Sequence, residues 1–297
     1  MLRSRWLFGA VLLLAIVMGG KMIHRAMQPK YEGKTVEEWF ADWKYRNSEM
    51  PEPQRVEVCT NLGTNAVWYL WGEYRRNDSV VTAWIMEKKH RFFGSGYQFE
   101  TSHERQRHLK ALSTLHLLGG QCEPLIPEIV KHLKSSNPVE ACNMVSLLGS
   151  IRQQPDLVVP VIHLSLLSTN WESYQRKLHI DALGKFGPAA KSVLPELQKR
   201  FANPAATNQG ENHHLARAIL RINGPGPELG LFTNGLAAGD FVKSFSDICF
   251  LEQVGTNARS AAPILRDFMG TLTNESEIRY VIQVIQEIDP EARQNAP

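Results

Sequence analysis

Residues 174–201 read YQRKLHIDALGKFGPAAKSVLPELQKRF, and they form the clearest structural unit in the sequence. In its first half, apolar residues recur every three to four positions between Leu178 and Phe186, which predicts one buried face of a helix. Gly187 and Pro188 follow, and a glycine before a proline is typical of the point where one helix ends and another begins. The second half repeats the apolar spacing. The stretch therefore predicts a pair of helices with apolar inner faces.

A proline in a similar apolar frame recurs along the chain. The copies are Pro127, Pro160, Pro195 and Pro263, at intervals of 33, 35 and 68 residues. Because 68 is twice 34, the intervals indicate a period of about 34 residues, which is typical of stacked helical repeats. We expect each proline within about the first two turns of the second helix of its pair, where a missing N–H is tolerated best.

The same frame extends in both directions. One copy is expected at 216–224, inside the interval of 68 residues, and a weaker one near Leu62. The tetrapeptide GTNA occurs at 63–66 and again at 255–258, at the same phase of the frame. A last, truncated unit is expected around Ile288.

The stretch ALGKFGPAAKSVLPEL and its echoes resemble HEAT repeats, including the bacterial HEAT-like subgroup. The resemblance covers roughly Glu57 to the C-terminus and implies an all-α fold, an α-α superhelix of about five to six helix pairs. His179 and Pro155 depart from the pattern, since a small residue and an alanine are common at these two positions. The alternative is an irregular helical domain whose prolines align by accident. HEAT patterns specify the fold far better than the activity.

Residues 1–27 form a different kind of segment. Arg3 and Arg5 precede an uncharged run, Trp6–Gly20, which Lys21 closes. As a helix this run spans about 22 Å, shorter than the roughly 30 Å hydrocarbon core, and its length also suits a signal peptide. Because no clean cleavage site follows, we expect an uncleaved transmembrane anchor before the repeats. The bulk of the chain is then outside the cytoplasm, periplasmic in a bacterium; secretion after cleavage is the alternative.

Residues 28–56 are interpreted as a linker, Pro29–Gly33, followed by a capping helix. Thr35 and Glu38 form the sequence pattern of a capping box, which begins a helix. The apolar residues of this helix share one face; they are Val36, Trp39, Phe40 and Trp43. This face either seals the first end of the array or docks a partner, and the first interpretation is favoured because terminal repeats are atypical.

Residues 57–110 are expected to be a degenerate first repeat with an insertion at 72–108, and residues 111–297 the regular repeats. The insertion interleaves aromatic and basic residues. It is read either as an adaptable binding surface or as an extra helix with a solvated, charged face.

The chain carries no catalytic, cofactor-binding or metal-binding motif. Glu211, His213 and His214 lie close together, but adjacent histidines on a helix diverge by about 100 degrees and chelate poorly. The single His-Glu dipeptide, at 103–104, sets aside the HEAT-like di-iron hydroxylases, which use several. We therefore predict no catalytic residue, cofactor or metal.

The four cysteines have no metal-binding spacing and fall in or beside apolar stripes, so buried free thiols are expected. They are Cys59, Cys122, Cys142 and Cys249. A disulfide between Cys122 and Cys142 is the alternative.

With a net charge of +3 over 297 residues, the chain is not expected to bind nucleic acid through bulk charge. The predicted function is a non-catalytic scaffold or adaptor that presents a helical surface to a protein partner beside a membrane. One alternative is a HEAT-fold lyase or chaperone-lyase, which clustered His, Cys or carboxylate groups on the concave face would favour. Another is a module that binds anionic polymers or lipid headgroups through clustered basic residues. The basic residues at matching frame positions are Lys191 with Arg259, and Lys131 with Lys199.

Overall fold

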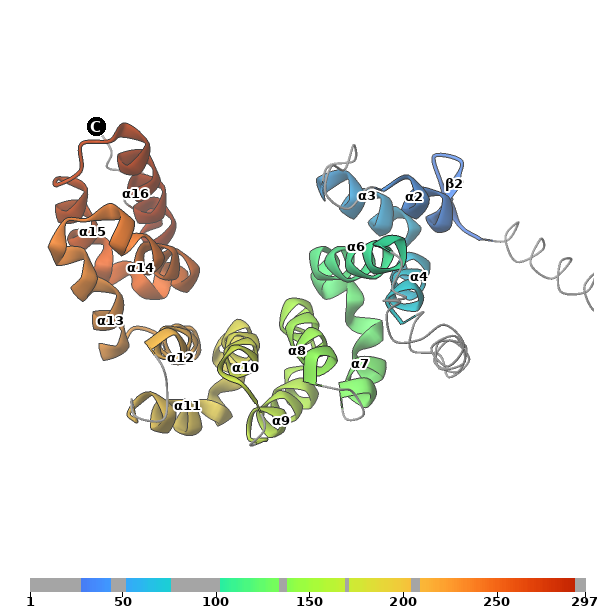
Figure 1. Ribbon diagram of the computed structural model, residues 1–297, viewed down its shortest axis with the longest axis horizontal. Helices are drawn as coiled ribbons and strands as arrows, with labels where there is room; N and C mark the ends of the chain where they lie inside the picture. Colours follow the sequence, from blue (N-terminus) through green and yellow to red (C-terminus); the bar gives the residue numbers. More distant parts are fainter. Residues whose placement is uncertain are drawn as a thin grey trace, which may run out of the picture. The chain divides into compact units, whose positions relative to one another are not determined.

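The protein is all-α, as the sequence predicts (Figure 1). The computed structural model describes residues 28–43, 52–75, 102–133, 138–168, 171–203 and 209–291. The chain divides into two compact units, Met1–Leu125 and Ile126–Pro297. No helix within the described ranges is long and apolar enough to cross a membrane. The run Trp6–Gly20, predicted to be an anchor, lies outside those ranges, as do residues 76–101 of the predicted insertion.

Unit 1 contains one small hairpin and a set of helices, with 3₁₀ segments labelled η. Its elements are β1 (Lys30–Tyr31), β2 (Lys34–Thr35), α2 (Val36–Asp42), α3 (Glu52–Leu62), α4 (Thr64–Tyr74), α6 (Ser102–Leu118) and η2 (Gly119–Leu125).

In unit 2 the helices come in pairs, and the first helix of a pair is longer than the second. Its elements are α7 (Ile126–Leu133), α8 (Pro138–Ile151), α9 (Pro155–Leu166), α10 (Ser173–Lys185), η3 (Gly187–Val193), α11 (Leu194–Phe201), α12 (Gln209–Asn223), η4 (Pro227–Leu229), α13 (Gly230–Thr233), η5 (Asn234–Ala238), α14 (Phe241–Val254), η6 (Gly255–Ala261), α15 (Ala262–Met269) and α16 (Glu275–Ile288).

The segment interpreted as a linker belongs in part to the hairpin of unit 1. Strands β1 and β2 pair antiparallel, with Lys30 opposite Thr35. Between them, Glu32 and Gly33 have φ values of 49° and 77°, as a two-residue hairpin turn with two left-handed positions requires. The hairpin then leads directly into α2.

Helix α2 begins with the predicted capping box. The backbone N–H of Thr35 donates to Glu38 Oε2 at 2.8 Å, and the backbone N–H of Glu38 donates to Thr35 Oγ1 at 3.4 Å. The apolar face of α2 is buried, with Phe40 and Trp43 1% and 2% exposed. It packs against α3 and α4, so this face is already occupied within unit 1.

A buried lysine of α6 binds the C-terminal end of α2. Lys110 is 7% exposed, and its Nζ donates to the carbonyl oxygens of Phe40 and Trp43 at 2.6 Å each. The ammonium also lies 4.1 Å from the centroid of the Phe40 ring. A cation at a helix C-terminus satisfies carbonyls that have no partner within the helix. Lys110 therefore holds α2 against α6.

Replacing Lys110 with methionine is expected to lower the free energy of unfolding by about 1–3 kcal/mol at pH 7, because two carbonyls lose a charged donor. Burial lowers the pKa of Lys110 to about 8, from an ordinary 10.5. Between these values the unfolded chain binds more protons, so the lysine's contribution to stability rises with pH. Urea unfolding from pH 7.5 to 10.5 should show the difference between wild type and variant growing. A constant difference would contradict this.

The four phased prolines lie in the first two turns of second helices of unit 2. Pro127, Pro195 and Pro263 are each the second residue of an α-helix, and Pro160 lies in the second turn of α9. All four positions agree with the sequence prediction. The helix expected to begin at Pro188 is different, because η3 comes first and α11 begins only at Leu194.

A glycine with positive φ opens each of the three long 3₁₀ segments: Gly119, Gly187 and Gly255 have φ values of 51°, 54° and 67°. These values lie in the region that favours glycine, so each glycine reverses the chain after its first helix. Gly63 of the first GTNA tetrapeptide has φ 63° and ψ −148°, close to the 67° and −142° of Gly255 in the second. The two tetrapeptides thus share their phase and the backbone geometry of their glycines.

A helix is also present where the sequence predicts one within the interval of 68 residues. Helix α12 covers the predicted 216–223 and ends before Gly224, whose φ is 90°. In place of a full second helix, the chain forms η4, α13 and η5. The proline of this second half, Pro227, therefore begins the short η4 and not an α-helix.

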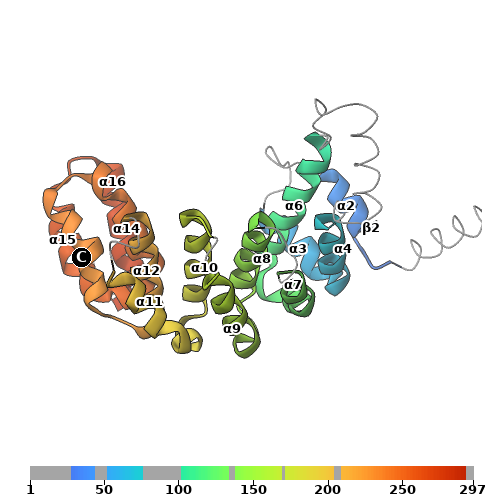
Figure 2. The ribbon, with the colours of Figure 1, turned by 60° about the horizontal axis from the view of Figure 1, so that its bottom comes forward.

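Successive first helices of unit 2 pack side by side, α8 on α10 and α10 on α12. Figure 1 shows these three helices in a row, and Figure 2 shows α14, α15 and α16 grouped beyond them. Small residues form the contacts of the row. A Cβ on Gly149 would lie 2.9 Å from Ala182 Cα, and a Cβ on Gly184 would lie 2.9 Å from Ala218 Cα. The helix backbones therefore meet closely at equivalent positions of two repeats.

His179, which departs from the HEAT pattern, is fully buried on α10. Its Nδ1 lies 2.8 Å from the carbonyl oxygen of Gln175, its Nε2 lies 2.9 Å from Ser165 Oγ of α9, and its ring contacts Trp171. The imidazole thus joins the second helix of one pair, α9, to the first helix of the next, α10. Burial lowers its pKa below the ordinary value.

Because the folded-state pKa of His179 is lowered, the unfolded chain binds the extra proton first as the pH falls through 6.5. We expect wild type to lose stability between pH 7 and pH 5 more steeply than His179→Leu. At pH 8, the variant should be less stable than wild type by about 1–3 kcal/mol, because Ser165 loses its partner. Urea midpoints across this pH range measure both effects, and parallel pH profiles would contradict the first.

Candidate functional site

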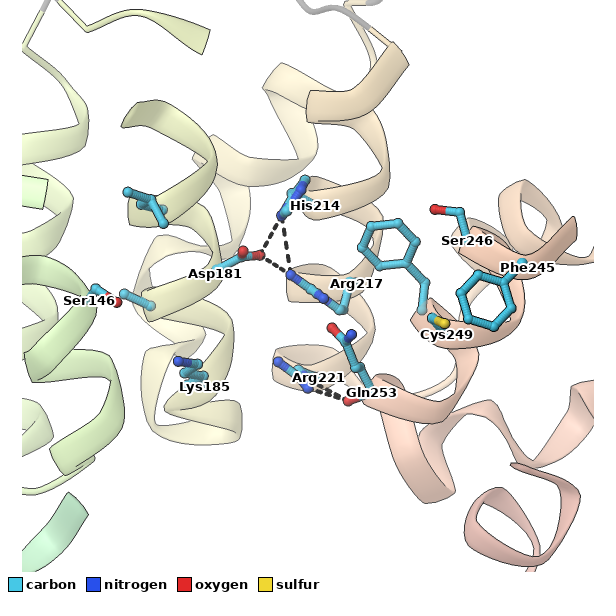
Figure 3. Close-up of a pocket in the computed structure, with 13 residues that line it drawn as sticks. Ser146, Asp181, Lys185, His214, Arg217, Arg221, Phe245, Ser246, Cys249 and Gln253 are labelled. Carbon is cyan, nitrogen blue, oxygen red and sulfur yellow. Dashed lines mark hydrogen bonds and ion pairs between the residues drawn. The ribbon is translucent and has the colours of Figure 1, made fainter. Parts of the chain in front are cut away.

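A pocket of about 720 Å³ opens over the first helices of unit 2. Its walls come from α10, α12 and α14, with Ser146 of α8 at one edge (Figure 3). The packing of the row explains its position. Gly184 and Ala218 allow α10 and α12 to meet closely. Between α12 and α14 the long side chain of Arg221 forms the contact, its Nε donating to the carbonyl oxygen of Gln253 at 2.8 Å. The pocket lies beside this contact.

A carboxylate lies at the centre of the polar side of this pocket. Asp181 Oδ1 lies 2.7 Å from His214 Nδ1 and accepts a hydrogen bond from an Nη2–H of Arg217 (Figure 3). Burial acts to raise the pKa of Asp181, but the hydrogen bond from His214 and the charge of Arg217 outweigh it, so this pKa lies below its ordinary value. Asp181 is therefore ionised at neutral pH and compensates Arg217.

Two further cations line the pocket, Lys185 at the end of α10 and Arg221 on α12. Burial lowers the pKa of both, and the neighbouring charges of Arg217 and Arg152 lower it further, against Asp181. Within the described ranges Lys185 has no hydrogen bond or ion pair. The polar side of the pocket therefore has an excess of positive charge.

The opposite wall is aromatic. The Arg217 guanidinium lies 4.8 Å from the centroid of the Phe250 ring, and His214 packs edge-on against the same ring. Phe245 is 47% exposed and contacts Tyr280 of α16, with ring centroids 5.6 Å apart. Aromatic and cationic groups together are typical of the centres of binding sites.

Arg217 joins the two walls. It is 6% exposed, and its Nε is buried without a hydrogen-bond partner in the described part of the chain. The Arg217 side chain is thus held by Asp181 on the polar wall and by the Phe250 ring on the aromatic wall.

Glu211, His213 and His214, considered above as a possible metal site, each contact a different partner. Glu211 is ion-paired with Arg176 of α10, His213 Nε2 lies 3.0 Å from Asp247 Oδ1 of α14, and His214 is bonded to Asp181. No group of three His, Cys, Asp or Glu side chains in the described ranges is placed to hold a metal ion.

The basic positions predicted from the repeat frame are on the surface, and one of them is compensated. Lys131, Lys191 and Lys199 are exposed, whereas Arg259 is ion-paired with Asp289 and Glu291. Three other cations that align are Arg152, Lys185 and Arg221, spaced by 33 and 36 residues. Sequence reasoning missed them, although the repeat frame contained this signal.

All four cysteines are free thiols. Cys59, Cys122 and Cys142 are buried, as expected, and burial raises the pKa of the first two to about 12. Cys249 is different, because it lines the pocket and its Sγ lies 3.2 Å from the Tyr280 hydroxyl.

A scan of protein-family models and searches of curated proteins and of solved structures find no match to this chain.

Proposed function

We propose that this chain is a HEAT-like repeat protein, an α-α superhelix, that acts as a non-catalytic scaffold and holds a partner protein on its first helices. The pocket carries this proposal, since it combines uncompensated cations with an exposed aromatic surface. The recurring order of first helix, glycine turn and proline-led second helix supports the repeat class. Residues 1–27 are proposed to tether the scaffold to a membrane, on the composition of the run Trp6–Gly20 alone.

The pairing of polar groups in the pocket favours binding over covalent catalysis. A nucleophile and its base are expected within hydrogen-bond reach of each other. Here His214 is bonded to Asp181, and Cys249 is bonded to the Tyr280 hydroxyl. Neither has a hydrogen bond to the other in the described structure. The lyase alternative therefore has less support than the scaffold.

A crosslinking pull-down from cells tests the tethered scaffold, comparing the full-length chain with a chain that begins at Gln28. We expect the full-length bait to capture one defined protein and the shortened bait to capture much less of it, because the membrane concentrates the two proteins together. Capture of nothing by a folded, abundant full-length bait would exclude the proposal.

The alignment of Arg152, Lys185 and Arg221 favours a second candidate, the binding of an anionic polymer or lipid headgroup. Such binding should weaken steeply with salt, because counterions are released from the polymer. Titration with inorganic polyphosphate at two salt concentrations distinguishes this candidate from the scaffold.

A further inference from the structure

We infer that the pocket binds an acidic segment of the partner protein. A carboxylate of the segment is held by Lys185 and Arg221, and an apolar side chain next to it packs against Phe245 and Phe250. This inference rests on the proposed scaffold function and specifies the chemistry that the scaffold recognises.

The excess of positive charge in the pocket favours an anionic ligand. Among the described residues that line it, Asp181 is the only carboxylate, and it is already bonded to His214 and Arg217. Its charge also acts on Lys185 and Arg221, but neither of these cations forms an ion pair with it or with another acidic residue of the described ranges. Arg221 uses Nε and Nη2 on the Gln253 carbonyl oxygen, which leaves its Nη1 available. An incoming carboxylate would meet two cations and form charge-assisted hydrogen bonds, which are stronger than neutral ones.

The other side chains that line the pocket favour an apolar group beside that anion. Leu178, Ala182, Phe245 and Phe250 line the same pocket as the cations. A volume of about 720 Å³ lies within the usual range of ligand pockets and accommodates more than one side chain. Phe245 is 47% exposed, so contact with an apolar side chain would remove aromatic surface from water.

An acidic peptide fits this pocket better than a phosphate. The doubled charge of a phosphate increases its attraction to the pocket cations as well as its repulsion from Asp181, so the apolar lining decides between the two ligands, and Phe245 and Phe250 offer a phosphate group no partner. A peptide also supplies the acidic and apolar groups side by side. These features favour an acidic peptide over a headgroup or polyphosphate.

The test is a selection of random dodecapeptides displayed on phage against the full-length chain in non-ionic detergent. Selected peptides are then synthesised with a fluorescent label, and their affinity is measured by anisotropy. We expect them to share Asp or Glu beside an aromatic or aliphatic residue. Changing that Glu to Gln should weaken binding about tenfold, the loss expected for one hydrogen bond to a charged group.

The variants Lys185→Met and Arg221→Met should each weaken the acidic peptide about tenfold and leave its Gln analogue unchanged. Lys185 has no bond to lose within the described fold, so this variant separates binding from folding. Lys199→Met, which removes an exposed cation of α11, is the matched control and should bind as wild type does.

Each other outcome overturns the inference. Selected peptides without acidic residues, or acidic peptides insensitive to both pocket variants, would exclude carboxylate recognition and leave the scaffold proposal standing. If no peptide is selected while polyphosphate binds and Lys185→Met weakens it, the site is one for anionic polymers. If neither binds, the inference fails, and partner capture in cells decides the scaffold proposal separately.

Discussion

Replacing Arg176 with alanine is expected to lower the free energy of unfolding of the protein by about 3–5 kcal/mol. Arg176 of α10 holds the carboxylate of Glu211 on α12 through Nε, at 3.1 and 3.2 Å, and through Nη2, at 3.0 Å. The Glu211 side chain is 1% exposed. Without Arg176 the Glu211 carboxylate would stay buried and lose this ion pair, which is more destabilising than losing an exposed contact. Urea unfolding measures the loss.

Two further variants test whether the loss comes from the buried ion pair. Arg259→Ala removes an arginine that is 51% exposed and paired with Asp289 and Glu291, so it should lower stability far less than Arg176→Ala does, because solvent screens an exposed ion pair. Replacing both Arg176 and Glu211 with apolar residues should recover part of the loss, because no buried charge is left unpaired. Equal losses for Arg176→Ala and Arg259→Ala would contradict the account of this pair.

Replacing Gly184 with alanine is expected to lower the free energy of unfolding by about 1–3 kcal/mol. The new Cβ would lie 2.9 Å from Ala218 Cα and 3.0 Å from its Cβ. A backbone atom cannot avoid the new Cβ by changing rotamer, as a flexible side chain can, so α10 and α12 would have to separate. This strain opposes the gain of about 0.5–1 kcal/mol that alanine usually brings to a helix interior.

Gly72 of α4 is the matched control, because it is also a helical glycine but a Cβ there meets nothing within 4 Å. Gly72→Ala should therefore stabilise the protein by up to about 1 kcal/mol. Opposite signs for the two substitutions in chemical denaturation are the expected result. Stabilisation by Gly184→Ala would mean that α10 and α12 do not meet at this residue.

The local signals of the sequence predicted much of this fold. Apolar spacing, the Gly187-Pro188 pair and the Thr35 capping box each depend on neighbours a few residues away, and these elements are present in the structure. The 3₁₀ segment before Leu194 was not predicted, because spacings of three and four residues produce similar apolar stripes in 3₁₀ and α-helices. The hairpin was missed since its strands are two residues long, too short for an alternating pattern.

The pocket could not be predicted in the same way. It depends on which neighbouring first helices meet through small residues and which are joined by side chains as large as Arg221. That is a property of residues on different helices, which the period alone does not fix. The spacing of Arg152, Lys185 and Arg221 was visible, but the frame offered several such basic sets and no reason to choose among them.

The most direct test of the proposed binding face is photo-crosslinking in cells, with a benzophenone amino acid replacing Phe245 in the full-length chain. Leu164 of α9, 69% exposed, receives the same replacement as the control. We predict that irradiation joins one defined protein to the chain from position 245 and not from position 164. An adduct from 164 alone, or none from either position in a folded and abundant chain, would contradict the proposal that this face holds a partner.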